Sequence, residues 1–201
     1  SYYRNRNLLA RGAMMEAFAA ETNTFRLGFG RINKGSASVD GVNTSVIESS
    51  ATYGGGGVRP FAAARKVNLF KWWDDLRANG GTPLVEAWKA NGEYYSRTDN
   101  RSPWTDDPST TNTVANNKTC RRSYTIISTD GYWNGPGVTL GASDADANSD
   151  NTDGATITGI GATYKYVKSK PYADGAAHTL ADVSMHYWKT DLQPSTVNAV
   201  P

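Results

Sequence analysis

Apolar side chains recur at helical spacing in four stretches of the chain, which predicts helices at 5–21, 61–77, after Thr82 and at 178–189. In the second stretch, one apolar face is formed by Val67, Phe70, Trp73 and Leu76. The pair Gly80-Gly81 ends this stretch. We expect Thr82 to cap the third helix, because Pro83 then occupies the first helical position, where proline is favoured.

Strand patterns lie between these helices. Residues 24–32 alternate Phe25, Leu27 and Phe29 with Arg and Gly, which predicts a strand with one buried face. The apolar run 124–129 predicts a buried strand that ends at Asp130. Residues 34–57 are polar and Gly-rich, and we interpret them as a hairpin or excursion with a short strand at 44–48.

The order of these elements predicts the fold class. Helix, strand, helix, helix, strand, helix is typical of an α/β sheet with helices on both faces. At 201 residues the chain is long enough for a single domain, 1–201. The predicted sheet has few strands for a domain of this size, and we therefore expect a piece of it to be missing from this chain.

Composition excludes several classes of function. The net charge is +2 and no long basic run exists, which argues against nucleic-acid binding. No run of about 18 apolar residues is present to span a membrane. Abundant Gly, Ser, Thr, Asn and Asp predict long loops, typical of an elaborated extracellular domain. With two isolated histidines and no nucleophile elbow, zinc-protease motif or phosphate loop, we expect no enzyme.

Thr82 and Asp130 are the candidate metal ligands. Thr82 alone is either a plain helix cap or a hydroxyl that contacts a cation. Asp130, before Gly131, is either a turn residue or a carboxylate at the carboxyl end of a strand, where ligands of α/β sheets collect. Carboxylate and hydroxyl oxygens suit a divalent cation such as magnesium, calcium or manganese.

An acidic loop forms a second candidate metal site. Oxygen-bearing side chains alternate as in the first half of a calcium loop, and Asp153 follows them; the residues are Asp144, Asp146, Asn148, Asp150 and Asp153. Ser149 stands where such a loop has glycine, and Ala155 where it has a bidentate glutamate. The two interpretations are a calcium loop and a solvated polar loop.

Two further residues are candidates for a functional role, Cys120 and Trp104. Cys120 is the single cysteine, so it is either a buried small apolar residue or half of a disulfide with a partner outside this chain. Trp104 lies in a polar loop beside Asp106-Asp107 and is the best candidate for an exposed contact, with sugar stacking as one role. Most other aromatic pairs are expected to pack in or near the core.

Several motifs carry a family resemblance. Two loops resemble parts of a metal-ion-dependent adhesion site: Gly80-Gly81-Thr82-Pro83-Leu84 and Ser128-Thr129-Asp130-Gly131. Further matching stretches are Ser1 to Arg6, Arg26 to Asn33, Cys120 to Tyr124, Thr129 to Asn134, Asp150 to Gly154 and Thr179 to Leu192. Together they resemble a von Willebrand factor A-type domain, and more closely the PilC/PilY family of type IV pilus tip-associated proteins.

This resemblance implies a fold and a role. The fold is a von Willebrand factor A-like (Rossmann-like) sheet flanked by helices, with long loop insertions and its first strand missing. The role is that of the amino-terminal part of a large secreted protein in pilus biogenesis, adhesion and surface sensing, located outside the cell at the pilus tip or bacterial cell surface. The implied partners are minor pilins or tip proteins and a host or surface ligand.

The resemblance also indicates which residues would bind a metal ion. The family's metal loops map onto Thr82 and Asp130, while the Asp-x-Ser-x-Ser loop would precede Ser1. A completed site would hold a divalent cation whose open position accepts an acidic group from a partner. The alternative is a metal-independent scaffold that docks onto minor pilins.

Overall fold

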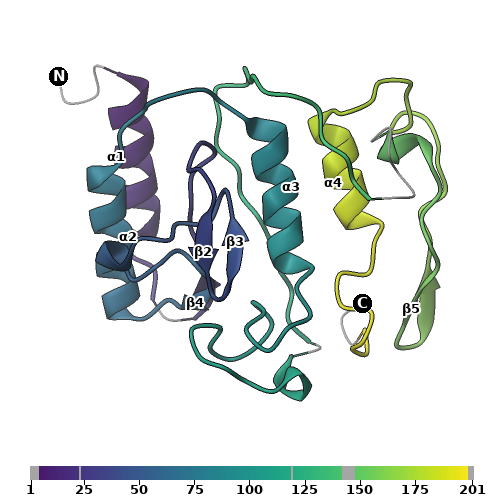
Figure 1. Cartoon of the computed structure of the whole chain (residues 1–201), viewed down its shortest axis with the longest axis horizontal. Coiled ribbons are helices and arrows are strands. Elements are labelled where there is room, and N and C mark those ends of the chain that lie inside the picture. The colour runs from purple at the N-terminus through teal and green to yellow at the C-terminus, as the bar shows by residue number, and fades with distance from the viewer. Residues whose placement is uncertain (1–4, 23, 119, 142–147, 199–201) are drawn as a thin grey trace.

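The computed structural model describes residues 5–22, 24–118, 120–141 and 148–198. Four α-helices dominate it: α1 (Arg6–Ala19), α2 (Ala63–Asp75), α3 (Leu84–Tyr95) and α4 (Leu180–Trp188). In Figure 1, α1 and α2 lie together at one end, α3 stands in the middle, and α4 lies beside α3. Three short 3-10 turns complete the helical content: η1 (Ala51–Tyr53), η2 (Val114–Asn116) and η3 (Ser149–Asn151).

The four predicted helices are all confirmed, and local capping explains two of their starts. The Asn5 side chain accepts a hydrogen bond from the Leu8 N–H at 2.9 Å and caps α1. At α4, Thr179 and Asp182 form a reciprocal capping box, in which each side chain accepts from the other residue's backbone N–H.

Two predicted details of the helices are wrong. Thr82 does not cap α3: Pro83 occupies the cap position and makes no side-chain hydrogen bond. On α2, Trp73 is buried and Phe70 and Leu76 pack against the core as predicted, but Val67 is 66% exposed, and Leu69 and Trp72 complete the buried face. Leu69 and Trp72 together bury more apolar area than Val67 could, which favours this orientation of the helix.

The strands form three separate two-stranded antiparallel ladders in the described part of the chain. They pair β1 (Arg26–Leu27) with β4 (Arg59–Pro60), β2 (Ala37–Val39) with β3 (Val42–Thr44), and β5 (Ile157–Gly159) with β6 (Ala162–Tyr164). The mixed helix and strand content is confirmed, as is the hairpin within 34–57. The short strand there ends at Thr44, where the sequence pattern predicted its start.

The expected sheet with helices on both faces is not found among these residues. The predicted strand 24–32 shrinks to β1 plus one isolated bridge, Gly30 to Ile47. The predicted buried strand 124–129 is wrong, because this segment belongs to no ladder and Tyr124 and Ile126 are 78% and 85% exposed. A strand needs a neighbouring strand for its backbone hydrogen bonds, and none of the described residues pairs with this segment.

The core consists of three apolar clusters. The first packs α1 and α2 against β1 and β4, the second joins α3 to α4, and the third fills the space between the β2–β3 hairpin and α3. Almost fully buried members of these clusters include Phe61, Leu69, Val85 and Val183. This arrangement fixes the amino-terminal end of α3, where the candidate site lies.

Arg65 is a buried side chain beside the first cluster, and its hydrogen bonds stabilise the surrounding backbone. Its guanidinium donates to the carbonyls of Leu27 (3.1 Å), Gly55 and Gly57, and it lies 4.6 Å from the centre of the Phe29 ring. Burial lowers the pKa of Arg65 to about 10, with the charge of Arg59 acting in the same direction. A single buried side chain on α2 therefore holds β1 and the glycine-rich turn together.

Candidate functional site

The turn before α3 and the loop after Asp130 are joined by a reciprocal hydrogen-bonded pair. The Thr82 N–H donates to Asn134 Oδ1 at 2.6 Å, and the Asn134 N–H donates to the Thr82 carbonyl at 3.0 Å. The same carbonyl accepts the Leu84 N–H at 2.8 Å. The structure thus brings the turn that contains Thr82 against the loop that follows Asp130, although Thr82 and Asn134 are 52 positions apart in the sequence.

Glycines make this close approach of the two loops feasible. A Cβ added at Gly81 would lie 2.7 Å from Asn134 Oδ1, and one at Gly135 would lie 2.5 Å from Glu86 Oε1. Gly135 also has φ +125°, a backbone conformation that L-residues avoid. Glu86 lies in the first turn of α3, where its negative charge is favourable beside the helix N-terminus.

Asp130 is held by an ion pair with α1. Its Oδ2 accepts from Arg6 Nη1 at 2.6 Å, and the two side chains are 49% and 86% exposed. An exposed pair of this kind contributes about 0–1 kcal/mol, so a cation could displace Arg6 at small cost. No hydrogen bond to the Thr82 hydroxyl is recorded among the described residues, which leaves that oxygen available as a ligand.

The described residues do not form a complete metal centre. Within 5–22, 24–118, 120–141 and 148–198, no group of three or more His, Cys, Asp or Glu side chains is arranged to hold a metal ion. Thr82 and Asp130 could therefore supply at most part of a coordination shell. The geometry supports a docking point for a partner charge more directly than a closed metal site.

The acidic loop is only partly within the described residues. Asp144 and Asp146 lie outside them. Asn148 directly precedes η3, and Asp150 within η3 is 3% exposed. Asp153 instead accepts from the Lys168 N–H at 3.0 Å and lies 3.6 Å from Lys165 Nζ. The described carboxylates of this loop thus have separate protein partners, and the calcium loop stays a prediction.

Asp150 is a buried carboxylate packed against α4. Its N–H lies 3.4 Å from Asp182 Oδ1, and its Oδ1 lies 3.5 Å from the Asp174 N–H. Burial raises the pKa of Asp150, and the charges of Asp182 and Asp174 add to this shift. Lys189 lies nearby and donates to the carbonyls of Ser149 (2.5 Å) and Thr152 (2.9 Å), which fastens η3 to α4.

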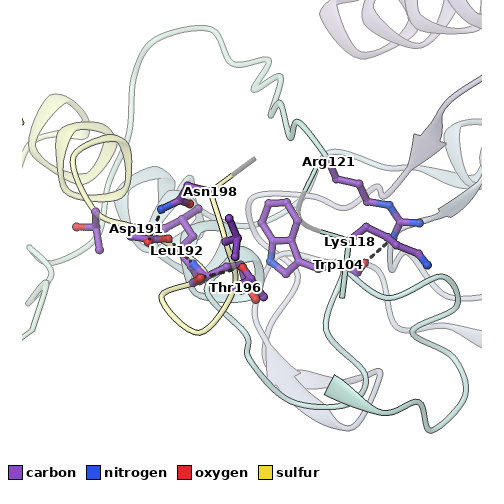
Figure 2. A pocket seen from close by; sticks show the side chains of 10 residues that line it. Trp104, Lys118, Arg121, Asp191, Leu192, Thr196 and Asn198 are labelled. Atoms are coloured by element: carbon purple, nitrogen blue, oxygen red, sulfur yellow. Dashed lines mark hydrogen bonds between the residues drawn. The ribbon is translucent and has the colours of Figure 1, made fainter. Parts of the chain in front are cut away.

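Trp104 lines a pocket of about 200 Å³ (Figure 2). Its indole N–H donates to the Tyr95 carbonyl at 2.7 Å, so the ring is half-buried and fixed. The other walls come from Lys118, Arg121 and the segment 190–198. Arg121 donates to the Trp104 carbonyl at 2.6 Å and to Asp106 at 2.7 Å, so its guanidinium is already engaged. Trp104, the best candidate for an exposed contact in the sequence, is therefore half-buried, and the sugar-stacking role stays a prediction.

Cys120 is exposed and has no disulfide partner among the described residues. The interpretation as a buried apolar residue is wrong. The disulfide with a cysteine outside this chain remains a prediction.

Three residues of these sites were not singled out by sequence reasoning. Asn134 and Arg6 carried no local signal for their roles, because their partners are remote in sequence. Asp182 did carry a local signal, since Thr179 three residues before it completes the pattern of a capping box.

No described helix is long and apolar enough to cross a membrane.

Comparison with known proteins gives one consistent result. The chain is 33% identical over 194 residues to the type IV pilus biogenesis factor PilY1 of Pseudomonas aeruginosa strain PAO1, and 35% identical over 198 residues to that of strain UCBPP-PA14. These matches cover 96% and 98% of this chain and 15% of each relative. No family model matches the chain, and no solved structure matches it either.

Proposed function

Because this chain belongs to the PilC/PilY family as a homologue of a segment of the type IV pilus biogenesis factor PilY1, we propose that it is a non-enzymatic module of type IV pilus biogenesis. The observation that carries the proposal is the identity of 33–35% along almost the whole chain. Pilus components are then its partners, and the pilus tip or the bacterial cell surface is its location.

Deletion of the coding region in the organism that carries it tests this role. We expect surface pili to be lost and to return when the wild-type region is restored. Pilus numbers that do not change on deletion would contradict the proposal. Pilin levels inside the cell serve as the control, since a defect in assembly lowers surface pilin without lowering total pilin.

The finer form of the proposal is metal-dependent adhesion by a von Willebrand factor A-like fold. Thr82 and Asp130 would supply oxygen ligands to magnesium, calcium or manganese, and the cation would accept an acidic group of a host or surface ligand. The contact between Thr82 and Asn134 supports this form, because it brings the two loops to one end of α3. The half-exposed Asp130 carboxylate is accessible from solvent.

The second form is a metal-independent scaffold that docks onto minor pilins. The ion pair between Arg6 and Asp130 favours it, because an arginine already neutralises the carboxylate that a cation would need. In this form the loops before α3 and after Asp130 have a structural role only.

Calorimetric titration with Mg²⁺, Ca²⁺ and Mn²⁺ separates the two forms. Metal-dependent adhesion predicts heat of binding that Asp130→Asn abolishes and that Arg6→Gln increases, because the latter frees the carboxylate. The scaffold form predicts no heat for any of the three proteins. In cells, Asp130→Asn would remove adhesion but not pili in the first form, and would leave both intact in the second.

A further inference from the structure

The pocket beside Trp104 is built from segments that are far apart in the sequence. One wall consists of Trp104, Lys118 and Arg121, and the other is formed by the segment 190–198 that follows α4. Figure 2 shows the Trp104 ring between Arg121 and the labelled residues of that segment. The volume of about 200 Å³ lies below the range of pockets for drug-sized ligands, so we expect a ligand group no larger than a single ring.

Both walls are anchored to the carboxyl end of α3. The Trp104 indole N–H donates to the Tyr95 carbonyl at 2.7 Å, and the two rings meet edge-to-face with their centres 5.9 Å apart. On the other wall, the buried Gln193 donates from Nε2 to the carbonyls of Tyr95 (3.3 Å) and Arg97 (2.8 Å). The pocket is therefore preorganised, which lowers the entropy lost when a ligand binds.

Asp191 supplies hydrogen-bond acceptors to the wall formed by 190–198. Its Oδ1 accepts the Gln193 N–H at 2.9 Å, and its Oδ2 accepts from Asn198 Nδ2 at 3.0 Å. These bonds orient the half-buried carboxylate, and each oxygen keeps a second acceptor position because a carboxylate oxygen has two lone pairs. Asp191 is therefore positioned to accept hydrogen bonds from a ligand in the pocket.

The opposite wall supplies hydrogen-bond donors. Lys118 Nζ lies 3.3 Å from Asp106 Oδ2, and Arg121 Nη2 donates to Asp106 Oδ1 at 2.7 Å. An ammonium carries three N–H donors, so Lys118 can still donate to a ligand. An ionic ligand of either sign would meet one wall that attracts it and one, with Asp191 or with the two cations, that repels it. The charges of the pocket therefore favour a neutral ligand.

A neutral ring that carries hydroxyl groups matches this arrangement. A hydroxyl both donates and accepts, so the hydroxyls of one ring can donate to Asp191 and accept from Lys118. The C–H face of a sugar ring is apolar and packs on the apolar face of the Trp104 indole. A ligand without polar groups would leave the donors and acceptors of both walls without partners.

We propose that this pocket binds one neutral hexose unit of a glycan, with Trp104 as the stacking surface, Asp191 as the acceptor and Lys118 as the donor. The proposal gives the sugar-stacking role of Trp104 a defined site. It goes beyond the role in pilus biogenesis and uses neither Thr82 nor Asp130, so it holds or fails independently of both forms of the proposed function.

Saturation-transfer difference NMR with the 201-residue protein tests the proposal. The neutral probes are glucose, galactose, mannose, N-acetylglucosamine and N-acetylgalactosamine, and the charged probes are glucuronic acid and glucosamine. We expect at least one neutral sugar to receive saturation at its ring protons and to bind more tightly than both charged sugars. If no neutral sugar binds, or if a charged sugar binds more tightly than all of them, the proposal is overturned.

Paired variants make the test specific to the pocket. Trp104→Leu removes the aromatic face and should weaken sugar binding about tenfold. Trp188→Leu, the same change at a tryptophan of α4 that is 70% exposed, should leave binding unchanged. Lys118→Met removes one donor and should weaken binding about threefold. Its control is Lys165→Met, since Lys165 also lies beside an aspartate, 3.6 Å from Asp153, but outside the pocket.

Circular dichroism shows whether each variant is folded. The Lys118 side chain is exposed, so Lys118→Met keeps the test decisive if Trp104→Leu does not fold. Sugar binding that survives in folded Trp104→Leu, or that responds equally to Lys118→Met and Lys165→Met, would refute the assignment of this pocket.

Discussion

Asn134 Oδ1 accepts the Thr82 N–H at 2.6 Å, and the Asn134 N–H returns a hydrogen bond to the Thr82 carbonyl at 3.0 Å. This pair links the turn that opens α3 to the loop that follows Asp130. It holds the turn that contains Thr82 against the chain four residues beyond Asp130, so its strength contributes to how firmly the candidate site is assembled.

Removal of the Asn134 side chain should destabilise the protein. Asn134→Ala deletes one of the two hydrogen bonds, and we expect the free energy of unfolding to fall by about 1 kcal/mol. Urea denaturation measures the change.

A double-mutant cycle with Gly81 shows whether the contact itself is responsible. Gly81→Ala places a Cβ 2.7 Å from Asn134 Oδ1 and should destabilise the wild-type protein. In the Asn134→Ala background the obstacle is gone, so the same change should cost less. Equal costs in both backgrounds would show that the two loops do not touch.

Arg65 should be the most sensitive charged residue of the first core cluster. Arg65→Met leaves the carbonyls of Leu27, Gly55 and Gly57 without their donor, and we expect a loss of about 3 kcal/mol of unfolding free energy. The matched control is Arg77→Met on the surface, expected within about 0.5 kcal/mol of wild type. Thermal unfolding followed by circular dichroism compares the two. Similar losses would contradict the role assigned to Arg65.

Ser109 should control the titration of Asp107. The Ser109 hydroxyl donates to Asp107 Oδ1 at 2.6 Å and lowers the pKa of this carboxyl below its usual value, and the Ser109 N–H acts in the same direction. A lowered pKa in the folded state stabilises the protein above the unfolded pKa, and this stability is lost as the pH falls through the folded pKa.

Ser109→Ala should therefore raise the pKa of Asp107 and destabilise the protein at neutral pH, with the difference from wild type vanishing in acid. NMR titration of the carboxyl carbon measures the shift. Thr110→Ala is the control, since the Thr110 hydroxyl donates to the Asp107 backbone carbonyl and not to its carboxylate. An unchanged titration in Ser109→Ala would contradict the assignment.

Lys189 should determine the stability of the contact between η3 and α4. Lys189→Met removes donors to the carbonyls of Ser149 and Thr152, and we expect a loss of about 2 kcal/mol. Hydrogen exchange should accelerate in residues 149–152 before it does in α3. The exposed Lys168→Met serves as the control, and exchange that speeds up equally in both variants would show that Lys189 does not fasten this contact.

Sequence patterns predicted the helices because helical hydrogen bonds are local. The apolar spacing in 5–21, 61–77 and 178–189 survives in α1, α2 and α4 with ends that differ by a few residues. The face of α2 was less predictable. Whether Val67 or Leu69 is buried depends on the direction from which Phe29 and Phe61 pack, and no local pattern records that direction.

The predicted strand at 124–129, in contrast, did not form. Its residues favour a strand, but a strand forms only where a second strand supplies hydrogen bonds, and none of the described residues lies in that position.

The sequence by itself determined the four helices, the absence of a catalytic motif and the resemblance that the PilY1 relatives bear out. The tertiary structure alone decided that Asp130 faces Arg6, that Thr82 faces Asn134 and that Cys120 is exposed. The reason is physical: a helix is specified by neighbours three and four residues away, whereas the partner of a loop side chain is set by how distant segments pack.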